Sequence, residues 1–152
     1  MSESEAEIGS VEELLESTRI IDVLFMELNA SRIESSHEES AEAERDLDLA
    51  TMLRHEGNEL DVRFLLEFKD NAASYRVDVV ARYCVEDDRS IPPRVSSEFI
   101  ERVAAFAAFP FLREALATSA ARLRVDPPIL GILRQGDIKV SEWPSEDAPA
   151  TS

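Results

Sequence analysis

Apolar and polar residues alternate over several stretches in the first half of the chain. The clearest is residues 59–69, where Leu60, Val62, Phe64, Leu66 and Phe68 point one way and mostly charged side chains point the other. Residues 75–85 alternate in the same manner. A third alternation starts at Asp46-Leu47-Asp48-Leu49 and continues through Thr51 and Leu53. These three stretches are predicted to be β-strands.

A fourth strand is predicted over residues 20–28, which are apolar apart from Asp22 and Glu27. A strand that is apolar on both sides is typically covered on both faces, and in a small domain the second cover can be another subunit. The later strands are joined by short polar connections, such as Gly57-Asn58 and Asp70-Asn71. Short connections favour antiparallel neighbours, so we expect a four-stranded antiparallel sheet.

The second half of the chain has helical periodicity. Phe99, Val103 and Phe106 share one stripe of a helix that Ser96 or Ser97 can cap. A second stripe runs over residues 111–123. Because Pro110 suits a first helical position, we expect one helix to end and another to begin at Phe109-Pro110. Strands followed by two to three helices predict an α+β fold.

The two ends of the chain differ from its centre. Residues 1–9 are polar and predicted to be disordered, and Ser10-Val11-Glu12-Glu13 has the form of a capping box that predicts a short helix. After Gly136 the sequence is polar again. The chain is therefore divided into an acidic N-terminal segment, disordered or briefly helical (1–17), one domain (18–134) and a flexible tail (135–152).

Charge and composition narrow the classes of function. The 152 residues include 32 acidic and 16 basic ones, a formal net charge of -16. This charge argues against binding a nucleic acid or an anionic membrane. No apolar run long enough for a membrane span is evident, and the N-terminus lacks the pattern of a secretory signal. Cys84 is the single cysteine, so no internal disulfide can form, and a cytoplasmic location is expected.

Signals for catalysis or metal binding are weak. His37 lies beside Glu38 and Glu39, but a solvated loop is the simpler interpretation. The four glycines do not build a phosphate-binding loop, and Cys84 is expected to be an inert packed thiol. We therefore predict no catalytic residue, no metal site and no cofactor, and we do not expect an enzyme.

Three segments, in the right order, resemble the SecB-type export chaperones. Asp46-Leu47-Asp48-Leu49, ahead of Leu60–Phe64, is similar to the family's Leu-Asp-Leu strand and the strand after it. Residues 109–114 (Phe-Pro-Phe-Leu-Arg-Glu) resemble its helix junction, and Asp126-Pro127-Pro128 with residues 129–133 resembles its crossover into a final apolar helix. The resemblance covers residues 18–134. The double proline and Trp143-Pro144 are closer to actinobacterial SecB-like proteins, some of which protect the antitoxin of a toxin–antitoxin pair.

The resemblance implies an ATP-independent holdase that assembles as a homotetramer, a dimer of dimers. Its partners would be unfolded preproteins awaiting export, or an antitoxin. The family's client groove corresponds here to Leu47, Leu49, Ile129, Ile132 and Leu133, and Phe109 is added from its expected burial alone. For each of these residues, ordinary core packing is the alternative.

The resemblance also implies docking on the secretion ATPase SecA through acidic residues of the sheet. Asp22 and Asp78 match two such positions. Arg76, however, stands where the family has an apolar residue, and the spacing from Asp22 to Glu27 is one residue longer than the motif. These departures favour a dedicated client such as an antitoxin, and a merely solvated sheet face is the alternative for both aspartates.

An oligomer is expected from the residues alone. The strand over residues 20–28 and the apolar residues Val77, Val79 and Ala81 provide more apolar surface than two helices should cover. We therefore expect Val77, Val79 and Ala81 at a subunit interface. Two other classes of function stay open: a dedicated acidic module that binds one partner, and a small-molecule enzyme with a cavity between sheet and helices.

Overall fold

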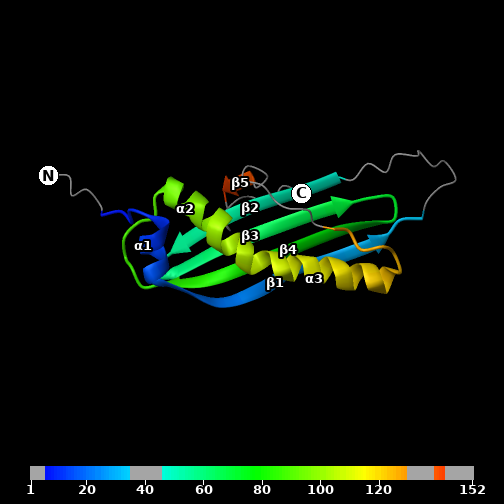
Figure 1. The fold of residues 1–152 in the computed structure, drawn as a ribbon, viewed down its shortest axis with the longest axis horizontal. Coiled ribbons are helices and arrows are strands. Elements are labelled where there is room, and N and C mark those ends of the chain that lie inside the picture. Colours follow the sequence, from blue (N-terminus) through cyan, green and yellow to red (C-terminus); the bar gives the residue numbers. More distant parts are fainter. Residues whose placement is uncertain (1–5, 35–45, 130–138, 143–152) are drawn as a thin grey trace, which may run out of the picture.

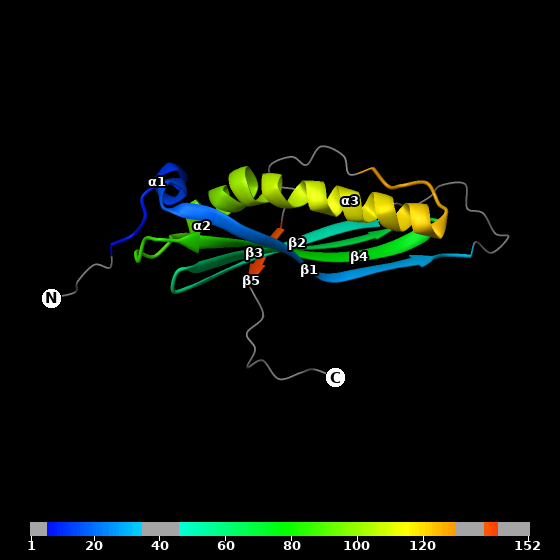
Figure 2. The same ribbon diagram turned by 90° about the horizontal axis from the view of Figure 1, so that it is seen from below.

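The helices of the molecule lie on one face of a single twisted sheet (Figures 1 and 2). The computed structural model describes residues 6–34, 46–129 and 139–142. Its elements, in chain order, are α1 (Val11–Glu16), β1 (Thr18–Arg32), β2 (Asp46–Glu56), β3 (Glu59–Lys69), β4 (Ala73–Val85), α2 (Pro93–Phe99), the π-helical turn η1 (Ile100–Ala104), α3 (Ala105–Leu123) and β5 (Lys139–Glu142). The predicted α+β fold is confirmed.

The strands are arranged in the order β1-β4-β3-β2-β5. The first four strands pair antiparallel, as the sequence predicts. β5 was not expected: it pairs in parallel with Ala50–Leu53 of β2 and lies within the segment predicted to be a flexible tail. The division of the chain at residues 17 and 134 stays a prediction.

The core lies between the sheet and the helices. Fully buried side chains on β3 and β4 face α2 and α3, and the largest of them include Phe64 and Leu66. Val77, Val79 and Ala81 have no exposed surface at all, because β4 is a central strand and its helix-side face is covered within one chain. These three residues are therefore core residues, and the expectation that they form a subunit interface is corrected.

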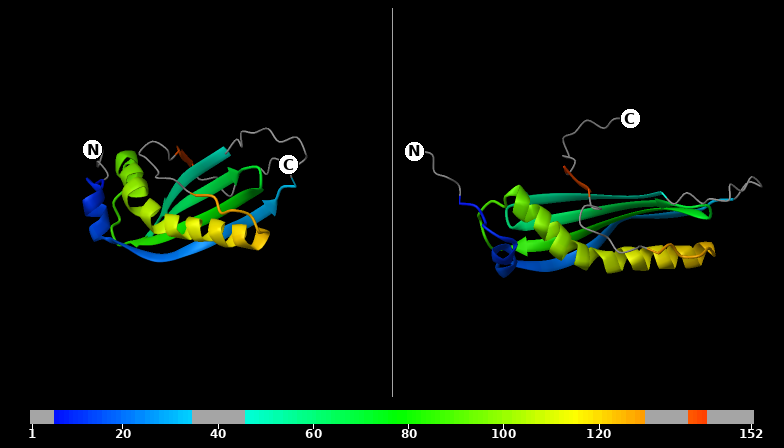
Figure 3. Two further views of the ribbon diagram at one scale, coloured as in Figure 1. Left: turned by 45° about the vertical axis from the view of Figure 1, so that its right-hand side comes forward. Right: turned by 45° about the horizontal axis from the view of Figure 1, so that its top comes forward.

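The helical region is one bent rod, not two helices that meet at Phe109-Pro110. Helical structure continues from Pro93 to Leu123 through η1, and Pro110 lies inside α3 (Figure 3). A proline inside a helix removes one hydrogen bond, here to the carbonyl of Phe106. Pro110 and Phe106 are both exposed, so water can satisfy that carbonyl, and a helix readily bends with its solvent side convex.

The same helical rod is long and rich in apolar residues. Residues Pro93–Leu123 form one helical stretch of 31 residues, and an 18-residue window within it has a mean hydropathy of 1.2. By length and composition alone, this stretch could cross a membrane. This differs from the expectation that no such stretch exists. Packing in the core accounts for much of the apolar character, since Leu112, Leu116 and Ala120 are buried.

α3 ends at a left-handed residue before the double proline is reached. Arg124 has a φ of 57°, its amide donates to the Ala121 carbonyl (3.2 Å), and the Val125 amide donates to the Ala120 carbonyl (3.0 Å). This pair of bonds is a Schellman motif, with Val125 packed against the core. Residues 124–129 then run back across the helix side of the sheet (Figures 1 and 3).

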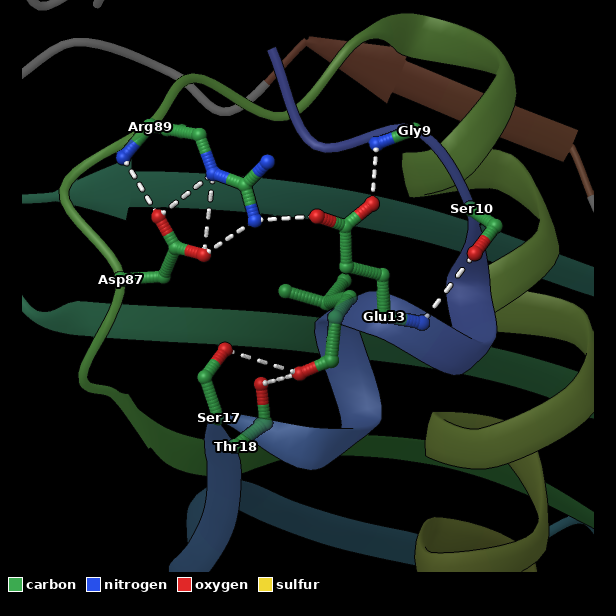
Figure 4. A network of polar contacts seen from close by, with 8 residues as sticks. Gly9, Ser10, Glu13, Ser17, Thr18, Asp87 and Arg89 are labelled. Carbon is green, nitrogen blue, oxygen red and sulfur yellow. Dashed lines mark hydrogen bonds and ion pairs between the residues drawn. The ribbon is translucent and has the colours of Figure 1, made fainter. Parts of the chain in front are cut away.

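The described part of the N-terminal segment is packed against the domain. Ile8 is fully buried and its amide donates to the Ser90 carbonyl (3.0 Å). The expectation that residues up to 9 are disordered is therefore wrong for residues 6–9. The predicted capping box is present in part: the Glu13 amide donates to Ser10 Oγ (3.1 Å), while the Glu13 carboxylate accepts from the Gly9 amide (3.0 Å) in place of the Ser10 amide (Figure 4).

Arg89 ties α1 to the loop that follows β4. Its guanidinium forms ion pairs with both Asp87 and Glu13 (Figure 4). The hydrogen bonds from Arg89 lower the pKa of Asp87 to about 2, and they also lower the pKa of Glu13. Both carboxylates therefore stay charged at neutral pH, and the contact between α1 and the loop persists.

Candidate polypeptide-binding surface

Leu47 is the exposed end of a row of side chains that crosses the helix side of the sheet. The strand register aligns Leu47, Phe68, Tyr75 and Ala30. Phe68 and Tyr75 are buried, with ring centroids 6.1 Å apart, whereas Leu47 is 45% exposed. An apolar side chain that extends a core row to the surface is available to an apolar partner.

The predicted groove residues divide into core and surface. Leu49 is buried, and half-buried Phe109 packs edge-on against Phe64 with ring centroids 6.0 Å apart. Ile129 is 83% exposed on the segment that returns over the helix side. Ile132 and Leu133 lie outside the described residues. Leu47 and Ile129 are therefore the predicted site residues that the structure leaves accessible.

A second exposed apolar area, the β1 surface, consists of five strand residues and one helix residue: Ile20, Ile21, Phe25, Met26, Leu28 and Phe111. Phe111 of α3 packs edge-on against Phe25, with ring centroids 6.3 Å apart. Register shifts between Ile20 and Asp22 and between Phe25 and Glu27 mark β-bulges, which leave Ile21 and Met26 unpaired.

The sequence indicated that β1 is apolar on both sides but did not show that α3 contributes to this surface. Phe106, which the sequence placed on one stripe with Phe99 and Val103, is 76% exposed, whereas Phe99 is buried. The π-helical turn η1 shifts the phase of the helix just before Phe106, and such a turn has no clear sequence signal. The available apolar surface is therefore larger than periodicity alone predicts.

The opposite face of the sheet, which no described helix covers, carries several paired charges. Asp78 is 3% exposed, and its carboxylate accepts from Arg63 Nε (2.9 and 3.0 Å) and Arg63 Nη2 (2.5 Å). The hydrogen bond to Asp78 raises the pKa of Arg63. Asp78 is therefore engaged within the chain and is not free to dock on a partner. Asp22 is exposed, and its Oδ1 accepts from the Val23 amide (2.8 Å).

Two further clusters continue this pattern. Asp61, 1% exposed, accepts from Arg54 Nη2 (3.0 Å) and Arg82 Nε (3.1 Å). Farther along β4, Arg76 forms ion pairs with Glu27 and Glu67. The hydrogen bond to Asp61 raises the pKa of Arg82. The carboxylates on this part of the face are thus largely neutralised by neighbouring arginines.

A polar hollow of about 710 Å³ lies at one end of the uncovered face. Its lining includes Asp46, Asp48 and Glu67, together with Lys69 and Arg76. Within residues 6–34, 46–129 and 139–142 there is no group of three or more potential metal ligands.

Burial raises the pKa of Tyr83 to about 12, and its hydroxyl finds no partner among the described residues.

Comparison with known proteins shows which proteins this chain resembles. No family model matches the chain. The SecB-like chaperone SmegB of Mycolicibacterium smegmatis is 29% identical over 132 residues, which span 87% of this chain and 86% of that protein. The chain is therefore similar to a SecB-like chaperone over most of its length. The resemblance predicted from three short segments is thereby confirmed.

Solved structures support the fold of this SecB-like protein. The Rv1957 SecB-like chaperone of Mycobacterium tuberculosis, solved with a ChAD peptide from the Rv1956 HigA1 antitoxin, superposes with a TM-score of 0.67. The match covers 81% of this chain and 92% of that chain at 16% identity. A protein of unknown function from Streptococcus agalactiae has a TM-score of 0.50 at 10% identity, with 76% and 97% covered.

Proposed function

We propose that this SecB-like protein is a non-enzymatic chaperone that binds unfolded or extended polypeptides without consuming ATP. Similarity to a SecB-like chaperone supports a chaperone role, and the observation that carries the proposal is Leu47, which brings a core row of the sheet to the surface. Burying apolar client side chains on such a surface contributes roughly 25 cal/mol per Å². Because folded proteins keep those side chains inside, binding favours the unfolded chain.

A dedicated client, such as an antitoxin in the cytoplasm, is the preferred partner. The M. tuberculosis relative was solved with an antitoxin peptide. On this chain Asp78, which would be needed for docking on SecA, is held by Arg63. The paired charges of the uncovered face therefore favour antitoxin protection over export.

Leu47→Asp tests the site. A charge at this position should weaken binding of a fluorescein-labelled extended peptide at least about tenfold, because burial of one leucine contributes about 1.5–3 kcal/mol. Leu49→Asp is unsuitable, since Leu49 is buried and the variant would unfold. Titration by fluorescence anisotropy measures the change.

The matched control is Leu15→Asp, which alters a leucine of similar exposure (42%) on α1, at the other end of the sheet (Figure 1). It should bind like the unmodified protein. Equal affinity of Leu47→Asp and Leu15→Asp would contradict the site. Suppressed aggregation of several unrelated unfolded proteins supports a general holdase, whereas capture of a single partner supports the alternative, a dedicated binding module.

We further propose a homotetramer in which the β1 surface is covered by a second copy. β1 is an edge strand of 15 residues that is apolar on both faces, and such an edge readily pairs with another strand. A second copy could continue the sheet across β1 and cover Met26, which is 61% exposed, together with Phe111.

Light scattering at micromolar concentration should give a mass four times that of the 17.0 kDa chain. Met26→Asp places a charge in the proposed contact and should lower the mass. Ile129→Asp, which alters an exposed residue outside the β1 surface, should leave it unchanged. A monomeric mass for the unmodified protein would refute the assembly.

A further inference from the structure

β5 pairs with only four of the eleven residues of β2, Ala50–Leu53. Asp46–Leu49 pair with β3 on their inner side and with no described strand on the outer side. The backbone amides and carbonyls of β2 thus form one continuous outer edge, of which one part pairs with β5 and the part at Asp46–Leu49 pairs with no strand among the described residues.

The side chains along this edge suit an extended polypeptide. Strand residues alternate between the two faces, so Leu47 and Leu49 face the helix side, and Asp46 and Asp48 face the polar hollow. A polypeptide that adds to the edge would form backbone hydrogen bonds that do not depend on its sequence, and one of its faces would contact exposed Leu47.

β5 itself shows that this edge accepts a strand, and its hold is weak. It has four residues, fewer than a typical strand, and it pairs in parallel, which is slightly less stable per residue than antiparallel pairing. It pairs with β2 on one side only, because it is the outermost strand of the sheet. Such a strand can be displaced by a competitor that offers more backbone pairs.

We propose that the outer edge of β2, from Asp46 to Leu53, is where an extended client binds by strand addition, and that β5 is an internal competitor which the client displaces. This inference rests on the proposed function. It predicts that a client gains access to twice the length of edge once β5 has left. The affinity measured for the intact chain is then the affinity of the β5-free state multiplied by the fraction of molecules in which β5 is undocked.

Two prolines in β5 of the full-length chain, Val140→Pro together with Ser141→Pro, test the competition, because proline removes strand hydrogen bonds. The labelled extended peptide should bind about three- to tenfold more tightly to this variant. In the free variant the amides of Ala50–Leu53 should exchange with deuterium faster than in the unmodified protein. Thr151→Pro is the control outside β5 and should change neither quantity.

A chain that stops after residue 138 lacks β5 and provides a second variant, which should match the double-proline protein in affinity and in thermal unfolding midpoint. Unchanged affinity in both variants would show that β5 does not compete, and weaker affinity would show that β5 belongs to the binding site. Either result overturns the inference while the proposed function stands. Failure of the unmodified chain to bind the peptide would instead refute the proposed function.

Discussion

Arg63→Ala is expected to lower the free energy of unfolding by about 3–5 kcal/mol, because it leaves a carboxylate buried without its partner. The side chain of Asp78 is 5% exposed and receives hydrogen bonds from two nitrogens of Arg63. Alanine at position 63 can supply none of these bonds. Urea unfolding followed by circular dichroism measures the change, since the midpoint falls while the slope stays constant.

A second variant separates the pair from the packing around it. Replacing both residues with apolar ones of similar size, Arg63→Met with Asp78→Leu, removes the unpaired charge and should recover most of the lost stability. Asp22→Ala removes an exposed carboxylate from the same face and should change stability by less than about 0.5 kcal/mol. A large effect of Asp22→Ala, or none of Arg63→Ala, would contradict the assignment of Asp78 as a buried, engaged group.

This ion pair also bears on function. A face that presents free carboxylates can attract a basic partner, whereas a face on which arginines hold the carboxylates presents little net charge. Asp61 and Asp78 are both of the second kind. Asp61 and Asp78 therefore do not offer free charge to a basic partner, and the net charge of -16 does not by itself create a docking site at these two positions.

The antiparallel sheet could be predicted from the sequence because residues close together in the chain determine where each strand lies and which strand it pairs with. Alternation at period two sets the face of each side chain, and the short Gly57-Asn58 connection sets the pairing of β2 with β3. The same reasoning placed Leu47 and Leu49 on one face correctly. Alternation could not tell that Leu47 is exposed and Leu49 buried, because that difference depends on which elements lie above each residue.

Features that depend on distant contacts were not predictable in this way. The interior position of Pro110 depends on an exposed carbonyl and on a sheet around which the helix bends. The burial of Val77, Val79 and Ala81 within one chain depends on α3 lying over β4. β5 has no composition that distinguishes it from a polar tail, and its pairing with β2 joins segments that are far apart in the sequence.

The packing of the N-terminal segment is the clearest example of a feature that depends on distant contacts. The short helix could be predicted from its capping residues, but six helical residues would not be stable alone. α1 is held by the burial of Ile8, Val11 and Leu14 in the same core as the sheet. Leu14 contributes twice: its side chain is fully buried, and its carbonyl accepts from Thr18 Oγ1 (2.6 Å) where β1 begins (Figure 4). The segment is therefore structural, and its removal should unfold the adjoining end of the sheet.

Leu14→Ala is accordingly expected to lower the free energy of unfolding by about 2–5 kcal/mol, the usual range for a leucine deleted from a core. The neighbouring Leu15→Ala shortens a side chain that is 42% exposed and should cost less than about 0.5 kcal/mol. Both variants keep the backbone bonds of α1, so the difference between them isolates side-chain burial. Chemical denaturation of the two variants measures that difference, and equal, small losses would show that residues 6–17 pack too weakly to belong to the core.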